Sequence, residues 1–438
     1  VAVVVALSLL LTISPEAPAD APRTLRAGSD AELARALAHI RPGDTILIAD
    51  GTYREPLLVK TSGQGPEKPI AIKAEHARKA IFTRKGQAAR IDGSFLRFEG
   101  LVFDSEYGNC TCVRAAGRDI RFIGCEIRRP GSVDGKGGGD GLQFFDSSDG
   151  LVEDCFIHHC LSTRDGERFD SHGIRFTHSH DMVVRKCIID LVSGDCVQVD
   201  PNRKAWDNIL VEGCTLSGGK VAADDRYPHP GFPPGGYTSE NAIDTKCPGT
   251  GRPHITIRDC DVYGFRGPIG NAAAFNIKEA CEAVIDRCTI HDSVIGLRLR
   301  GPAHVRVTNC VLYDNDTHCR YEDRIPHLHM VHCTFGRATS GGHGAFQEQR
   351  PSPDLRVLAC LFLGEKPRQA SDASNRAAAA AGFVDPSKGD YRLSAAIPLS
   401  GGGRAPDHAE AKVDRSGAAR PADRPADVGA FQYRPLRP

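Results

Sequence analysis

Two charged residues, Asp244 and Lys246, lie two positions apart in the stretch SENAIDTKCPG, residues 239–249. Residues two apart on a β-strand point to the same side, so a strand here would present both charges on one face. A lysine among other cations gives up its proton more readily and can act as a general base. Carboxylates beside it can hold a metal ion. The pair therefore predicts a proton-transfer site, provided that neighbouring strands supply the remaining groups.

The elements that would position these residues come from an internal repeat. Residues 141–157, 173–189 and 296–312 align without gaps; residues 274–290 fit the same frame, and residues 196–216 and 242–262 fit it with a short insertion. Each unit contains a small residue, a short strand of alternating polarity, a turn, and a second alternating strand that ends in Cys. Such strands, recurring at a spacing of roughly 20 to 30 residues, indicate a solenoid.

The repeat favours one solenoid over the others. A leucine-rich repeat requires its own Leu and Asn spacing, and a propeller requires four strands in each blade. We therefore expect an all-β protein, a single-stranded parallel β-helix. Its coils would stack about 4.8 Å apart, so that equivalent residues form columns.

The 16 cysteines do not follow a disulfide pattern. The column of cysteines that ends the second strands is expected to point inward as buried, small apolar side chains. Its members are Cys125, Cys155, Cys187, Cys214, Cys260, Cys288, Cys310, Cys333 and Cys360. The remaining cysteines could still include a disulfide bridge or two.

The two ends differ from the repeats. Residues 1–21 have the pattern of a signal peptide with a truncated start, and the apolar run is too short to span a membrane. We expect a secreted or periplasmic protein. Its β-helix would comprise residues 22–363, beginning with an amphipathic helix that covers the first coil. Residues 364–438 would form a linker and an extended segment packed on the last coils. The chain carries no net charge, which gives no reason to expect nucleic acid or an anionic membrane as a partner. We expect a monomer.

The alternation divides the first strand of each unit into inward and outward positions. The inward positions are almost wholly apolar: Leu142/Phe144, Ile174/Phe176, Val197/Val199, Ile243/Thr245, Phe275/Ile277 and Leu297/Leu299. The outward positions are Gln143/Phe145, Arg175/Thr177, Gln198/Asp200, Asp244/Lys246, Asn276/Lys278 and Arg298/Arg300.

The outward positions from Arg175 to Arg300 form one polar stripe, about 20 Å long at the spacing between strands. The longest insertion, residues 217–240, lies beside it and contributes further polar and aromatic side chains: Asp224, Asp225, Tyr227, His229, Tyr237 and Glu240. Any single outward charge is more often a solvated surface residue. The stripe and the long loop together favour a functional groove that would suit a few sugar rings.

A resemblance to a known family rests on other motifs. PGDTILIADGTYRE, KPIAIKAE and FLRFEGLVF resemble the amino-terminal part of secreted right-handed parallel β-helix proteins of the pectate-lyase superfamily, especially the alginate lyase and chondroitinase B group. The ending VDPSKGDYRLSAAIP…DVGAF is similar to the closing segment of bacterial β-helix proteins. The resemblance implies a polysaccharide lyase with a Lys base, an Arg and, in many members, a Ca²⁺ held by acidic residues.

β-Elimination from a uronic-acid polysaccharide requires cations for the C6 carboxylate, a base near C5 and a proton for the leaving O4. We expect Lys246 to be the base, with Lys278 as the second candidate, and Arg298 and Arg300 to hold carboxylates. Substrate-binding positions are then Arg175, Gln198 and Asn276, with Tyr237 or His229 as proton donor. Asp200, Glu240 and Asp244 are the expected Ca²⁺ ligands. The family's Arg lies on the coil after its Lys, whereas Arg298 and Arg300 lie two coils past Lys246, which leaves Lys278 as a possible substitute for that Arg.

Other functions remain open alternatives. The carboxylate pairs Asp224/Asp225 and Asp195/Asp200 could serve a glycoside hydrolase, and a C5-epimerase would share the elimination chemistry. A non-catalytic carbohydrate-binding or surface protein is the alternative from another class. His327 and His329 share one strand face and could bind a transition metal.

Overall fold

The computed structural model describes residues 21–135, 137–201, 205–249, 251–267, 269–339, 346–398, 412–422 and 425–434. The expected signal peptide lies almost wholly outside these residues. Among the helices of the described residues, none is long and apolar enough to cross a membrane.

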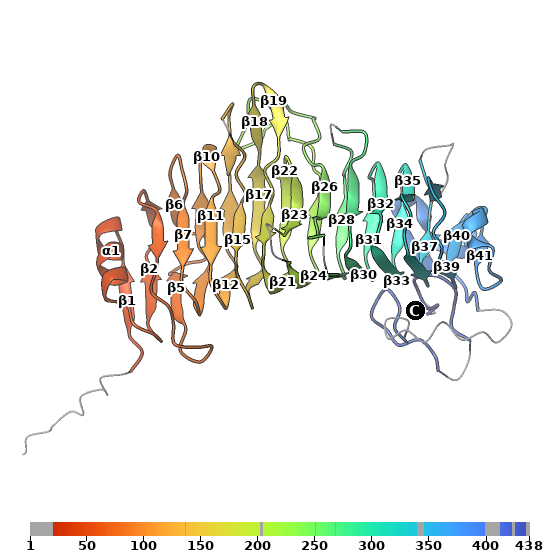
Figure 1. The fold of residues 1–438 in the computed structure, drawn as a ribbon, viewed down its shortest axis with the longest axis horizontal. Helices are drawn as coiled ribbons and strands as arrows, with labels where there is room; N and C mark the ends of the chain where they lie inside the picture. The colour runs from red at the N-terminus through yellow and green to blue at the C-terminus, as the bar shows by residue number, and fades with distance from the viewer. Residues whose placement is uncertain are drawn as a thin grey trace, which may run out of the picture.

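Three long parallel sheets form an elongated solenoid, and successive coils follow one another along its axis (Figure 1). A typical coil passes through a strand of sheet C, a strand of sheet A and a strand of sheet B. The chain is therefore a parallel β-helix, as the repeat predicts.

The bounds of the strands are as follows. Sheet A contains β1 (Thr24–Ala27), β2 (Thr45–Ile48), β5 (Ile70–Ala74), β8 (Leu96–Glu99), β12 (Ile120–Ile123), β16 (Leu151–Glu153), β21 (His180–Arg185), β24 (Asp207–Glu212), β27 (His254–Arg258), β30 (Glu282–Asp286), β33 (His304–Thr308), β36 (His327–Val331) and β39 (Leu355–Leu358). Sheet B contains β3 (Gly51–Tyr53), β6 (Ala80–Thr83), β9 (Val102–Asp104), β13 (Glu126–Arg128), β17 (Phe156–Cys160), β22 (Ile188–Val192), β25 (Thr215–Ser217), β28 (Asp261–Tyr263), β31 (Thr289–His291), β34 (Val311–Tyr313), β37 (Thr334–Phe335), β40 (Leu361–Leu363) and β41 (Arg376–Ala378). Sheet C contains β4 (Leu57–Val59), β7 (Ala89–Asp92), β11 (Val113–Ala116), β15 (Leu142–Phe145), β20 (Ile174–Thr177), β23 (Asp195–Asp200), β26 (Asn241–Thr245), β29 (Ala273–Ile277), β32 (Ile295–Arg300), β35 (Thr317–Glu322) and β38 (Phe346–Glu348).

Short antiparallel hairpins project from the coils. They pair β10 (Gly108–Cys110) with β14 (Gly131–Ser132), β18 (Ser162–Arg164) with β19 (Glu167–Phe169), and β42 (Phe383–Asp385) with β43 (Asp390–Leu393). Figure 1 shows β18 and β19 standing above the solenoid. This hairpin becomes one wall of the site described below.

The inward columns form the core, as the alternation predicts. All the inward residues of the sheet C strands named above are buried, and Phe144 stacks on Phe176 of the next coil with ring centroids 5.5 Å apart. Because equivalent side chains pair in register, each apolar position continues through successive coils.

The cysteine column is confirmed as an inward ladder of buried thiols. A residue in the left-handed region precedes each ladder cysteine and turns the chain from sheet A into sheet B. These residues are Gly124, Asp154, Lys186, Gly213, Asp259, Arg287, Asn309, His332 and Ala359. All 16 cysteines are free, so the bridges that the sequence left open are not formed.

A helix covers the first coil, as expected. Helix α1 (Asp30–His39) buries Leu33 and Ala36 towards the solenoid end (Figure 1). A capping box begins it: the Ser29 side chain accepts a hydrogen bond from Glu32 N, and Glu32 Oε2 accepts one from Gly28 N at 2.7 Å.

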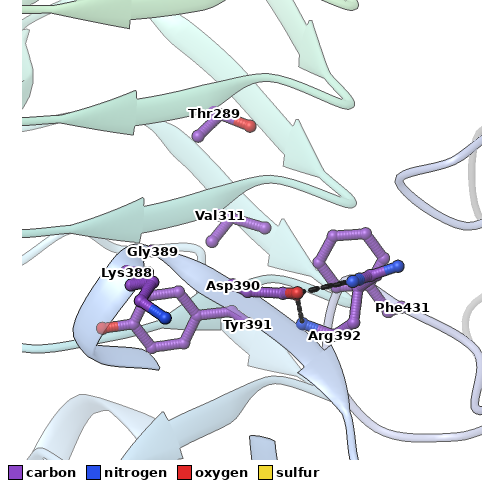
Figure 2. A pocket seen from close by; sticks show the side chains of 8 residues that line it. All are labelled: Thr289, Val311, Lys388, Gly389, Asp390, Tyr391, Arg392 and Phe431. Carbon is purple, nitrogen blue, oxygen red and sulfur yellow. Dashed lines mark hydrogen bonds and ion pairs between the residues drawn. The ribbon is translucent and has the colours of Figure 1, made fainter. Parts of the chain in front are cut away.

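The C-terminal segment packs on the last coils and adds one element that the sequence analysis missed. Strand β41 extends sheet B inside the segment expected to be a linker, which also contains three short 3₁₀ helices: η1 (Arg368–Ala370), η2 (Ala380–Gly382) and η3 (Pro386–Lys388). Figure 2 shows Tyr391 and Arg392 of β43, together with Phe431, near Thr289 and Val311. These residues line a cavity of about 350 Å³. The ion pair between Asp390 and Arg392 lines this cavity.

The burial of the cysteine ladder predicts selective thiol chemistry. In the native protein, a thiol-alkylating reagent should label Cys110 and Cys247, which are half-buried, before any of the other cysteines, which are buried. Mass spectrometry of the labelled peptides would check this order. Labelling of Cys260 or Cys288 at the same rate as Cys247 would contradict the inward ladder.

Candidate functional site

The outward positions of sheet C form one continuous polar row. Strand pairing places Gln198 beside Asp244, Asp244 beside Asn276, and Asn276 beside Arg298, as the repeat frame predicts. Gln198 is only 2% exposed, and Asp244 and Asn276 are each 4% exposed. A solvated sheet surface would leave such side chains open to water. The centre of the row is therefore the floor of a covered groove, not an ordinary polar surface.

Segments distant in sequence form the wall beside this floor. Arg168 of β19 donates from Nε to Thr238 O at 3.4 Å, and its guanidinium lies 3.4 Å from the Glu240 carboxylate. These contacts join the β18–β19 hairpin to the end of the loop 217–240. The wall is thus fixed by an ion pair between side chains 72 positions apart.

Lys246 and Lys278 lie next to this floor but have different partners. Lys246 Nζ donates to Gln198 Oε1 at 3.3 Å, and no carboxylate of the described residues lies within ion-pair distance of it. Lys278 Nζ is paired with Asp244 Oδ1 at 2.9 Å, and Asn276 Nδ2 donates to the same oxygen at 2.8 Å. Lys278 is therefore paired directly with a carboxylate, whereas Lys246 is hydrogen-bonded to a neutral amide and interacts with the charges of Asp195 and Asp244 at longer range.

The backbone beneath both lysines is fixed. The buried Trp206 donates from Nε1 to Lys246 O at 2.6 Å, and Lys246 N continues the ladder to Val199 O. Thr245 Oγ1 accepts from Lys278 N at 2.8 Å and donates to Lys278 O at 3.0 Å. Such fixed backbones allow the two ammonium groups to act from defined positions.

Two acids of the groove hold protons more tightly than usual. Burial first, and the nearby charge of Asp195 second, raise the pKa of Asp244 to about 7, against the opposing effect of Lys278. Burial likewise raises the pKa of Glu240, and the charges of Asp195 and Asp170 raise it further. Perturbed acids gathered in one groove are typical of a functional site.

Sequence reasoning missed a second polar column at the start of the sheet C strands. Each of its residues directly precedes the small residue of a repeat: Asp140, His172, Asp195 and Asn241. His172 Nδ1 accepts from Asp195 N at 2.9 Å, and Asn241 Nδ2 donates to Asp195 Oδ1 at 2.7 Å. All four are buried. Extending the repeat frame by one position would have revealed this column; only Asp195 had been considered, as half of a carboxylate pair.

The arginines proposed from the sequence lie on the stripe but are already paired. Arg175 contacts Asp200 at 2.5 Å and Asp140 at 3.8 Å. Arg298 forms a two-pronged pair with Glu322 at 3.0 and 3.1 Å, and Arg300 lies 3.5 Å from the same carboxylate. The structure therefore does not direct Arg298 and Arg300 towards Lys246.

The two proton-donor candidates occupy different settings in the loop 217–240. His229 is buried: its Nε2 donates to Ser132 O at 3.0 Å and its Nδ1 accepts from Gly231 N at 3.1 Å. Nδ1 thus stabilises the loop itself, and Nε2 anchors the loop to β14. Tyr237 is half-buried, and Lys220 Nζ lies 4.7 Å from its ring centre.

The expected calcium ligands do not converge. Asp200 pairs with Arg175, Glu240 with Arg168 and Asp244 with Lys278. Another oxygen set, from Asn241, Asp195 and Glu240, has the chemistry that a hard cation prefers. Asn241 Oδ1 is buried without a hydrogen-bond partner, Asn241 Nδ2 donates to Asp195, and the charge of Asp195 acts on Glu240. Of the three expected ligands, Glu240 alone belongs to this set.

The raised pKa of Asp244 predicts a pH-dependent stability. Ionising Asp244 costs more in the folded chain than in the unfolded chain, so its contribution is complete below pH 3.8 and is lost as the pH rises to about 7. Between pH 5 and pH 8, the wild-type free energy of unfolding should fall by about 2 to 3 kcal/mol relative to Asp244→Asn. Denaturant titrations at both pH values would measure this difference. The variant Asp224→Asn, at an exposed acid of the loop 217–240, should show no such divergence. A difference between wild type and Asp244→Asn that stays constant with pH would contradict the assignment.

The comparisons with known proteins agree with this architecture. A search among curated proteins found no match. The sequence pattern of the family described as Chondroitinase B matches residues 27–116, and that of the right-handed beta helix region matches residues 79–227 and 245–368. Among solved structures, pectate lyase Pel9A is similar at a TM-score of 0.54 and 14% identity, over 94% of this chain and 96% of that one. The PL6 family alginate lyase AlyGC is similar at a TM-score of 0.52 and 12% identity, over 95% of this chain and 59% of that one.

At these identities the solved structures show the fold alone, a fold that polysaccharide lyases use. The β-helix pattern, however, covers more than half of the residues. The chain therefore belongs to the family of proteins with a right-handed beta helix region.

Proposed function

We propose that this protein is a polysaccharide lyase that cleaves an acidic, uronic-acid-containing polysaccharide by β-elimination. One observation carries the proposal: Lys246 lies at a buried polar floor and is hydrogen-bonded to a neutral amide, Gln198, while the neighbouring Lys278 is paired with the carboxylate of Asp244. β-Elimination requires two such groups, one that removes a proton and another that stabilises the negative charge that develops.

In this mechanism the neutral amine of Lys246 removes the proton from C5 of the uronic acid. The electron pair then forms the C4–C5 double bond, and the C4–O4 bond breaks. Lys278, which is paired with Asp244 in the free protein, would offset the growing negative charge of the C6 carboxylate, with the amide of Asn276 beside it. Tyr237 is the candidate that supplies a proton to O4.

The substrate class follows from the charges of the groove. Arg175, Lys246 and Lys278 lie along a row of four neighbouring strands, from β20 to β29, and so place basic side chains at several positions of the groove. Arg298 and Arg300 extend the cationic row, with Glu322 between them. An acidic polymer is therefore a better fit than a neutral one.

A calcium ion fits the oxygen set beside Lys246. Asp195, Glu240 and Asn241 Oδ1 would hold it, and it would supply Lewis-acid stabilisation of the substrate carboxylate. It would also offset the repulsion between Asp195 and Glu240 that contributes to the raised pKa of Glu240. The ion pair between Arg168 and Glu240 acts against calcium binding, because it already neutralises part of the Glu240 charge.

The proposed function is tested by absorbance near 235 nm, where the unsaturated product absorbs. The purified chain is incubated with pectate, alginate and glycosaminoglycan polymers, and the absorbance should rise on one of them. Lys246→Ala should lower kcat by about 10²- to 10⁴-fold, the usual contribution of a general base. Lys73→Ala, at an exposed lysine of β5 paired with Glu99, is the matched control and should keep full activity.

Other outcomes separate the alternatives. Exchange of the C5 proton with solvent without chain cleavage would indicate a C5-epimerase, and new reducing ends without absorbance would indicate a hydrolase. Full elimination activity in Lys246→Ala would contradict the assignment of the base.

The calcium proposal makes a separate prediction. A chelator should lower the elimination rate, and added Ca²⁺ should restore it in the wild type. In Glu240→Gln the Ca²⁺ concentration for half-maximal activity should rise by about tenfold or more, since a carboxylate ligand becomes a neutral amide. Activity that is unchanged by chelator would overturn the calcium role and leave the role of Lys246 intact.

A further inference from the structure

A cluster outside the groove has the chemistry of a metal site. His327 and His329 occupy alternate positions of β36, on the outer face of sheet A. The residue after each of them, Leu328 and Met330, is buried in the core. Asp354 directly precedes β39, and its backbone oxygen accepts a hydrogen bond from Leu328 N at 3.0 Å. Regular strand pairing thus fixes all three side chains beside one another.

The three side chains direct their ligand atoms to one point. His327 Nδ1 lies 2.7 Å and His329 Nε2 lies 3.1 Å from the same atom, Asp354 Oδ2. All three ligand atoms lie within 4.8 Å of one another, and the two imidazole rings are 3.7 Å apart between centroids. Ligand atoms about 2.1 Å from a metal ion are separated by about 3.0 to 3.4 Å at octahedral or tetrahedral angles. Only a small opening of the cluster would therefore admit an ion.

The carboxylate is oriented by a further residue. Arg356 Nε donates to Asp354 Oδ1 at 2.9 Å, which leaves Oδ2 towards the two imidazoles. Arg356 also pairs in register with His329 on the adjacent strand. Such an outer partner, which fixes a ligating carboxylate without touching the metal, is a regular feature of built metal sites.

Open space adjoins the cluster. A cavity of about 250 Å³ is lined by His327 together with His304, Glu282 and Arg306 of the two preceding strands. His304 pairs in register with His327, and their ring centroids are 5.6 Å apart. A metal ion held by the first three side chains would keep room for water or for a further ligand on this side.

We propose that His327, His329 and Asp354 bind a divalent transition-metal ion of the zinc type. Two imidazoles and one carboxylate suit such borderline ions better than Ca²⁺ or Mg²⁺, which prefer oxygen ligands alone. The ion would join β36 to the turn before β39 and thereby link two successive coils. This site is separate from the groove of Lys246 and does not depend on the proposed lyase activity.

Metal counting on the full, untagged chain tests the proposal. The protein is stripped with chelator, equilibrated with Zn²⁺ alone and desalted, and bound zinc is measured by mass spectrometry. The wild type should bind one more zinc ion per chain than the double variant His327→Gln/His329→Gln. Zinc should also raise the Tm of the wild type by a few degrees and leave that of the double variant unchanged.

Two further variants distinguish the proposed zinc ligands from residues that do not bind the ion. Arg356→Gln should weaken zinc binding by about 10- to 100-fold, as expected for a positioning residue. His76→Gln, which removes a single surface imidazole paired with Asp50, should bind zinc like the wild type. The double variant should keep its circular dichroism spectrum and any elimination activity. Equal zinc content in the wild type and a folded double variant, or no zinc in either, would overturn the proposal.

Discussion

In-register pairing between successive coils is the constraint on which the rest of this structure depends. A parallel strand leaves its side chains alternately inside and outside, and a shift by one residue would exchange the two sets. The apolar columns, such as Phe144 on Phe176, therefore fix the register of every sheet C strand. The same register places Gln198, Asp244 and Asn276 side by side on the opposite face. Packing energy in the core thus determines the geometry of the groove.

Burial in the groove gives residues of the same type different contacts and different pKa values. Lys246 and Lys278 end neighbouring strands, yet Asp244 and Asn276 hold only Lys278 as part of a network. Asp244 is an ordinary carboxylic acid by residue type, but burial and the nearby charge of Asp195 raise its pKa to about 7. The wall built by Arg168 and Glu240 supports this covered environment, which strengthens each charge interaction within it.

The fold could be predicted from the sequence because its determinants are local and repeated. Period-two alternation, turns and a cysteine at each corner define the coils, and the inward positions named from the sequence are buried in the structure. The frame also predicted that Asp244 lies between Gln198 and Asn276. Strand β41 was missed because Arg376–Ala378 carries no alternating apolar pattern.

The site was harder to predict because its decisive contacts join distant segments. Nothing in the sequence near Arg298 indicates that Glu322 neutralises it, or that Arg168 reaches Glu240. His229 was a candidate for its residue type, but one ring nitrogen accepts from Gly231 of its own loop and the other donates to Ser132 of β14. The column of His172, Asp195 and Asn241 was within reach of the repeat frame, since each residue directly precedes a repeat's small residue. The repeat frame begins at the small residue, one position after this column.

The central claim is that the groove breaks the C4–O4 bond by elimination, without adding water across it. Mass spectrometry of oligosaccharides released in water labelled with oxygen-18 tests this claim most directly. The account predicts unsaturated products that carry no oxygen-18 at the new ends. Products that each gain one labelled oxygen would show hydrolysis and would contradict it.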